Sequence, residues 1–128
     1  MEPPEKKKIT SYRDLVVWQK AMDLVELSYR LAKRLPPIEN YGLIAQIERS
    51  AVSVPANIAE GHGRRHLGDY LHHLSIANGS LMELETHFLI TVRLGYLQAK
   101  DVEPAAQLAE EVGRMLGGLV LKLESLRT

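Results

Sequence analysis

Apolar residues recur at every third or fourth position along four long stretches of the chain, and no stretch shows the two-residue alternation of a β-strand. This spacing predicts helices over residues 14 to 34, 40 to 61 and 66 to 94. It also predicts a fourth helix that is capped by Asp101, with Pro104 in its first turn. Short connections between long helices favour an all-α fold, an antiparallel up-down-up-down four-helix bundle.

Prolines, glycines and small polar residues mark the expected boundaries. Pro36-Pro37 stops the first helix, Asn40 is a suitable cap for the second, and Gly95 ends the third. Pro55 lies inside the second helix and either kinks it or divides it into two shorter helices. Residues 1–11 are rich in proline and charge and predict a flexible N-terminal tail, which leaves residues 12–128 as one domain.

The first predicted helix has an unusually wide apolar arc. At 100° per residue, its apolar side chains cover about half of the helix circumference, more than one core-facing stripe requires. The arc consists of Val17, Trp18, Met22, Leu24, Val25, Tyr29, Leu31 and Ala32. Surplus apolar surface is typical of an interface between subunits, so the protein is expected to assemble with itself. Alternatively, the first helix lies at the centre of its own bundle.

The second and third helices carry polar residues beside their apolar faces. Glu85 falls on the apolar stripe of the third helix, where an unpaired carboxylate would be costly, and Arg49 is the nearest partner across an antiparallel hairpin. This placement predicts a buried polar network that fixes helix register. Its expected members are Gln46, Arg49, Asn57, Ser80, Glu83 and Glu85. Alternatively, these polar residues form an active site or a ligand site, or they simply face solvent.

The charge composition bears on nucleic-acid binding. The chain has no net charge at pH 7, yet its cations gather near the N-terminus and in the connection before the third helix. The candidate phosphate-binding residues are Lys6, Lys7, Lys8, Arg13, Arg30, Lys33, Arg34, Arg64 and Arg65. They are not interleaved with aromatic residues, so any RNA or DNA binding should tolerate sequence changes and weaken with salt. The alternative interpretation is a solvated helix face with a solubilising tail.

Other classes of function find little support in the sequence. The chain contains no cysteine and no histidine spacing typical of a metal site, so we predict no metal, no cofactor and no catalytic residue. Arg65 and His72 have a spacing similar to a motif of helical-bundle ribonucleases, which is a remote alternative. No apolar run is long enough to span a membrane, and no signal peptide is evident, so a cytoplasmic location is expected.

Several motifs together resemble one known family. They are Tyr12, Asp14-Leu15-Val16-Val17-Trp18-Gln19-Lys20-Ala21, Glu39-Asn40-Tyr41-Gly42-Leu43, residues 46–61 ending in Asn57-Ile58-Ala59-Glu60-Gly61, residues 76–86 with Gly79-Ser80-x-x-Glu83-x-Glu85, and Leu94-Gly95-Tyr96-Leu97. The chain is similar to the four-helix-bundle proteins encoded in intervening sequences of bacterial large-subunit ribosomal RNA genes. The similarity covers residues 12–97, and the fourth helix agrees in pattern.

The resemblance implies a fold and an assembly but no reaction, because the family has no established enzymatic activity. It implies a homopentameric ring. The family is also similar in fold to the accessory variability protein of diversity-generating retroelements, which binds reverse transcriptase and nucleic acid. The implied partners are therefore further copies of this chain, RNA or DNA, and a polymerase-like protein. Because that accessory protein is strongly basic and this chain is neutral, a protein-interaction scaffold without nucleic-acid binding is the alternative.

Overall fold

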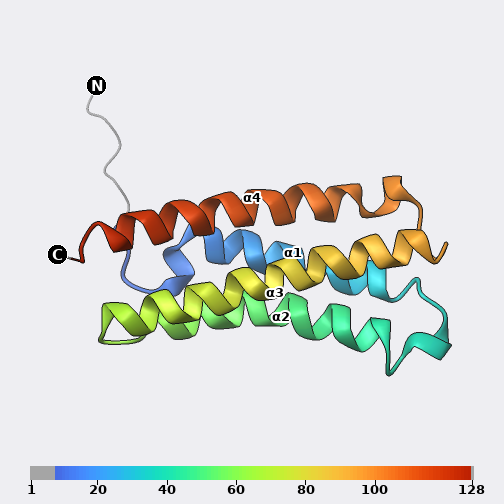
Figure 1. The fold of residues 1–128 in the computed structure, drawn as a ribbon, viewed down its shortest axis with the longest axis horizontal. Helices are drawn as coiled ribbons and strands as arrows, with labels where there is room; N and C mark the ends of the chain where they lie inside the picture. Colours follow the sequence, from blue (N-terminus) through green and yellow to red (C-terminus); the bar gives the residue numbers. More distant parts are fainter. Residues whose placement is uncertain (1–7, 128) are drawn as a thin grey trace.

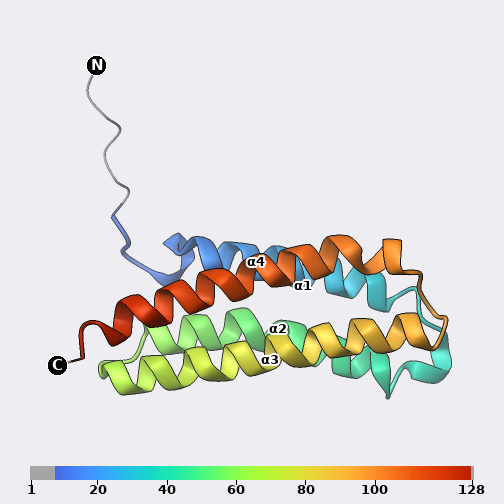
Figure 2. The ribbon, with the colours of Figure 1, turned by 45° about the horizontal axis from the view of Figure 1, so that its top comes forward.

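The computed structural model describes residues 8–127, which fold into four long α-helices and two short 3-10 helices. The elements are η1 (Tyr12–Asp14), α1 (Val16–Ala32), η2 (Pro37–Glu39), α2 (Leu43–His62), α3 (Leu67–Arg93) and α4 (Ala99–Glu124). Successive helices run in opposite directions (Figures 1 and 2). Both α1 and α3 pack against α2 and α4, which confirms the predicted up-down-up-down bundle.

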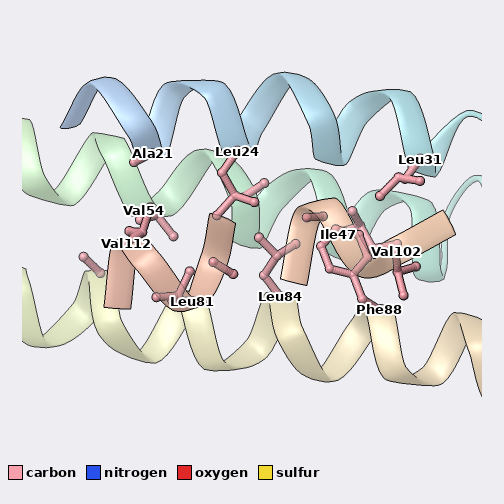
Figure 3. Packing of buried hydrophobic residues seen from close by; sticks show 14 of the residues in the cluster. Ala21, Leu24, Leu31, Ile47, Val54, Leu81, Leu84, Phe88, Val102 and Val112 are labelled. Atoms are coloured by element: carbon pink, nitrogen blue, oxygen red, sulfur yellow. The ribbon is translucent and has the colours of Figure 1, made fainter. Parts of the chain in front are cut away.

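One apolar core runs through the bundle and receives side chains from all four helices (Figure 3). Leu24 of α1, Ile47 of α2, Leu81 and Leu84 of α3 and Val112 of α4 are all fully buried. Burial of a side chain of this size stabilises the fold by about 1.5–3 kcal/mol. Within the described part of the chain, no helix has the length and hydropathy that crossing a membrane requires.

The first predicted helix begins later than expected and has a separate turn before it. Asp14 Oδ2 accepts hydrogen bonds from Thr10 N (2.9 Å) and Ser11 N (3.1 Å), and Ser11 Oγ accepts one from Arg13 N (3.1 Å). These capping bonds close η1, and the extended Leu15 separates it from α1. Thr10 and Ser11 are therefore tied to η1 rather than part of a free tail, and residues 1–7 of the predicted tail lie outside the described residues.

The start of α2 corrects the predicted cap. Asn40 lies in the turn after η2, and the helix begins at Leu43. Gly42 is the cap residue, and Glu39 Oε1 accepts a hydrogen bond from the first helical backbone N–H, Leu43 N (3.1 Å), while Glu39 Oε2 accepts one from Tyr96 Oη (2.9 Å). The helix continues through the buried Pro55 without interruption, so the proline does not divide it into two.

The connection from α3 to α4 confirms the predicted role of Gly95 and corrects the predicted start of α4. Gly95 has a positive φ of 78°, a backbone conformation that glycine adopts without strain. The helix begins at Ala99 with Gln98 as its cap, so Asp101 is its third residue rather than the cap, and Pro104 lies beyond the first turn. Asp101 instead closes the first turn by accepting a hydrogen bond from Gln98 N (2.8 Å). This bond is the main reason why the pKa of Asp101 is lowered. Arg34 pairs with the same carboxylate at 3.4 Å and joins the end of α1 to the start of α4.

Candidate functional site

A row of hydrogen-bonded polar side chains joins α2 to α3, and we call it the α2–α3 ladder. It consists of Ser53 and Asn57 of α2 with His73 and Ser80 of α3. The Oγ atoms of Ser53 and Ser80 lie 2.7 Å apart, Asn57 Nδ2 donates to Ser53 Oγ at 3.0 Å, and Asn57 Oδ1 lies 3.0 Å from His73 Nδ1. All four residues are partly buried, so the ladder satisfies polar groups at the edge of the core.

The two helices approach most closely where the ladder ends. A Cβ atom built on Gly61 would lie 2.8 Å from His73 Cβ and 3.0 Å from Tyr70 Cδ1, closer than side chains tolerate. Only glycine allows α3 to pass so near this turn of α2. The preceding residue, Glu60, pairs with Arg64 at 2.8 Å and lies 4.0 Å from His73 Nδ1. The last residues of the Asn57-Ile58-Ala59-Glu60-Gly61 motif therefore serve helix packing.

The predicted buried network is only partly assembled. Asn57 and Ser80 belong to the ladder, but Gln46, Arg49 and Glu83 are exposed. These three line an open crevice of about 360 Å³ together with His87. The expected pairing of Arg49 with Glu85 was wrong, since no ion pair joins them in the described structure.

Glu85 lies on the opposite flank of α3, where it faces α4. It lines a groove with Glu110 of α4, and burial, followed by the charge of Glu110, raises the pKa of the Glu85 carboxyl. The helix is turned so that Leu74, Leu81 and Phe88 form its core face, which carries Glu85 away from α2. Asn78, one helical heptad earlier, is exposed for the same reason.

His87 is a buried polar residue that sequence reasoning missed as a site residue. It is 8% exposed, and its Nδ1 is buried without a hydrogen-bond partner within the described residues. Burial lowers the pKa of its imidazole, against a smaller opposing effect of Glu83. A signal was available, because His73, Ser80 and His87 are spaced seven residues apart and so share the α2-facing flank of α3.

Two surfaces at the edge of the core combine buried apolar side chains with exposed ones. The α1 stripe consists of Trp18, Met22, Val25 and Tyr29, of which Met22 is 41% exposed and the others are partly buried. Tyr12 covers part of it through an edge-on contact with Trp18. The α3/α4 groove is lined by Glu85, Phe88, Leu89, Val102, Ala106 and Glu110, has a volume of about 330 Å³, and continues toward Arg93 and Ala99. Among the residues that line the groove, Leu89 is 66% exposed.

The candidate phosphate-binding cations do not form one cluster. Arg30, Lys33 and Arg34 lie at the end of α1, whereas Arg13, Arg64 and Arg65 lie at the opposite end of the bundle. Lys8 is exposed, and Lys6 and Lys7 lie outside the described residues. Arg34 and Arg64 are each paired with a carboxylate.

The remaining titratable groups form no recognisable centre. Between residues 8 and 127, no three His, Cys, Asp or Glu side chains lie close enough together to hold a metal ion. His72 is exposed on α3 and its ring contacts His73, while Arg65 lies in the connection before the helix. No bond joins Arg65 to His72 in the part of the chain that the structure describes.

The described features define a small all-α protein: a four-helix bundle with a hydrogen-bonded α2–α3 hairpin and with exposed apolar side chains at two edges of its core. The chain belongs to the 23S rRNA-intervening sequence protein family, whose family model matches residues 13–118. This finding confirms the family suggested by the sequence motifs.

A solved structure supports the same fold. It is a protein of unknown function from the S23 ribosomal protein family of Bacteroides thetaiotaomicron VPI-5482. The two chains share 24% sequence identity with a TM-score of 0.76, and the match covers 82% of this chain and 98% of the other. At this identity the similarity establishes the fold alone. No curated protein matches the chain.

Proposed function

We propose that this protein is a non-enzymatic subunit of a homopentameric ring that binds RNA or DNA at one end of its bundle. The observation that carries the proposal is the apolar surface left on α3, where Met82 is 47%, Leu89 66% and Ile90 37% exposed. Apolar side chains gathered along one element favour an interface. A ring would cover them and would repeat any charged end of the subunit once per copy, so that weak contacts add up.

The end of the bundle that contains the α2–α3 connection is the one we assign to nucleic acid. The start of α1 and the end of α4 lie at the same end (Figure 2). Arg65 is exposed there and has no ion-pair partner among residues 8–127. Arg127 lies beside the start of α3, since a Cβ on Gly68 would be 3.1 Å from its Nη2. Cations placed in this way suit phosphate oxygens, and no base-stacking surface accompanies them.

A protein-interaction scaffold without nucleic-acid binding is the second candidate. The net charge of zero favours it, because no overall field attracts a polyanion to the protein. In that case the ring would present its surface to a partner such as a polymerase-like protein. The two candidates share the ring and differ in the role of Arg65 and its neighbours.

Light scattering tests the ring first, and a single copy in solution would overturn the proposal. A filter-binding titration against a structured RNA hairpin then tests the charged end at about 50 and 200 mM salt, where phosphate contacts lose affinity steeply. The double variant Arg65→Glu and Arg127→Glu should bind more weakly, whereas Lys100→Glu, an exposed cation at the other end, should bind like the wild type. Affinity that does not change with salt would contradict phosphate binding and leave the scaffold.

A further inference from the structure

The two apolar surfaces lie on different sides of the subunit. The α1 stripe belongs to α1, and the α3/α4 groove lies between two other helices, with α1 and α3 at opposite corners of the bundle. A two-fold pairing that joins one surface to itself would leave the other surface exposed. Contacts that join the stripe of one copy to the groove of the next cover both, and such head-to-tail contacts close into a ring when the rotation between neighbouring copies divides a full turn evenly.

The two surfaces also lie at the same height along the bundle. Lys20 of α1 pairs with Glu111 of α4 at 3.0 Å, and Arg34 pairs with Asp101 at 3.4 Å. These two ion pairs align residues 20–34 of α1 with residues 101–111 of α4. Most of the stripe and the α4 side of the groove therefore share one level. A rotation about an axis parallel to the helices keeps that level, so it would bring the stripe of one copy opposite the groove of its neighbour.

Shape and charge fit the same pairing. The stripe presents large side chains, and the α4 side of the groove includes two small ones, Ala99 and Ala106, beside Val102 and Glu110. The charges beside the stripe are those of Glu26, Arg30 and Lys33, and the charges along the groove are those of Glu85, Arg93 and Glu110. The stripe thus borders one excess positive charge. In the groove, Arg114 offsets Glu110, with which it pairs, and Glu85 has no cation paired with it in the described structure.

Within the groove, Glu85 is the carboxylate that still needs a cation. Arg114 already binds Glu110 at 3.0 Å, and no cation pairs with Glu85 in the described structure. A partly buried carboxylate beside a second one is unfavourable unless a positive charge approaches it. Arg30 and Lys33 have no ion-pair partner of their own among the described residues, and they border the surface that would face the groove.

We propose that the α1 stripe of one copy seats in the α3/α4 groove of the next copy, with Glu85 beside the cations that border the stripe. This pairing rests on the proposed ring, because it names the two surfaces that form it. It makes the interface head-to-tail, so every copy uses its stripe on one side and its groove on the other.

Crosslinking tests the pairing cleanly, because the chain contains no cysteine of its own. The exposed Glu26 and Leu89 are replaced separately, as Glu26→Cys and Leu89→Cys, and each variant is treated with a short bismaleimide alone and after mixing with the other. We expect covalent dimers in the mixture only, and a ladder of higher species from the double variant. Dimers formed by either variant alone would show a two-fold contact and overturn the pairing.

A second pair of variants separates the pairing from the ring. Leu89→Glu should reduce the mass found by light scattering to that of smaller species, whereas Leu121→Glu, at 70% exposed in the wild type and outside the groove, should not. If the wild type is a single copy, the proposed function itself fails. If the wild type is a ring, but Leu89→Glu leaves it intact and the mixture gives no crosslink, the ring stands and this pairing is wrong.

Discussion

The two flanks of α3 meet their neighbours in different ways. Toward α2, the ladder bridges the helices with hydrogen bonds of 2.7–3.0 Å, and Gly61 brings the backbones close. Toward α4, Glu85 and Glu110 share a groove, and the helices are separated enough to leave about 330 Å³ between their outer edges. The first flank satisfies its polar groups internally, and the second leaves a carboxylate without a cation in the described structure.

This difference separates a structural role from a binding role. Polar side chains on the α2 side pair with each other, so they specify helix register and leave little for a ligand to bind. The α4 side combines exposed apolar atoms with an unsatisfied charge, which is what a partner surface offers. The motifs shared with the family lie largely on α2 and α3, and the ladder explains why several of those residues are polar.

The largest expected effect comes from filling the close approach on the α2 side. Gly61→Ala places a Cβ 2.8 Å from His73 Cβ and 3.2 Å from the Tyr70 carbonyl oxygen, so a helix must shift. We expect a loss of about 1–3 kcal/mol in the free energy of unfolding, measured by urea denaturation. The matched control is Gly113→Ala on the α4 side, where the new Cβ meets only the end of the Leu81 side chain at 3.3 Å. Equal losses would contradict the contrast between the flanks.

A smaller effect is expected from removing one rung of the ladder. Asn57→Ala takes partners from Ser53 and from His73 Nδ1, both partly buried. Ser53 Oγ keeps Ser80 as a partner, but His73 Nδ1 loses its hydrogen bond. Leaving a buried polar group unpaired costs about 1–3 kcal/mol, and this site should be at the low end because water has partial access. Asn78→Ala, an exposed asparagine on the other flank of α3, should change stability by less than about 0.5 kcal/mol. If the ladder contributes nothing to stability, Asn57→Ala and Asn78→Ala should give equally small changes in the free energy of unfolding.

The fold could be predicted from the sequence far better than the polar contacts. Helical spacing, the double proline and Gly95 fix the four helices, because these signals act within a few residues. The partners of Glu85 depend on how α3 is turned about its axis. A rotation error of one or two residues moves a side chain from the α2 flank to the α4 flank, so Glu85 was assigned to Arg49. The seven-residue spacing of His73, Ser80 and His87 indicates how α3 is turned about its axis, because it places all three on the α2-facing flank.

His87 extends the comparison to pH. Burial lowers its pKa below the ordinary 6.5, so the unfolded chain binds a proton more readily than the folded one. Stability should therefore be complete above pH 6.5 and decline as the pH falls toward the lowered value. His87→Gln should flatten this decline in urea unfolding measured between about pH 7.5 and 5, whereas His72→Gln, at an exposed position, should leave it unchanged. If stability declines with falling pH in His87→Gln as it does in the wild type, the buried His87 is not the cause of that decline.

Glu85 lies two residues earlier, on the other flank of α3. Its effect on the pH dependence of stability should be opposite in sign to that of His87 and the smallest of those predicted. Its pKa is raised above the ordinary 4.5, so the folded state holds the proton more tightly and loses stability as the pH rises through that window. Glu85→Gln should therefore unfold at a slightly higher urea concentration than the wild type at pH 7, and the gain should vanish below about pH 4. This comparison requires protein dilute enough for light scattering to find single copies.

In the assembled protein, Glu85→Gln should instead lower stability, because the glutamine cannot form an ion pair with the cations beside the α1 stripe of the next copy. A gain of equal size in both states would mean that no cation approaches Glu85 in the ring.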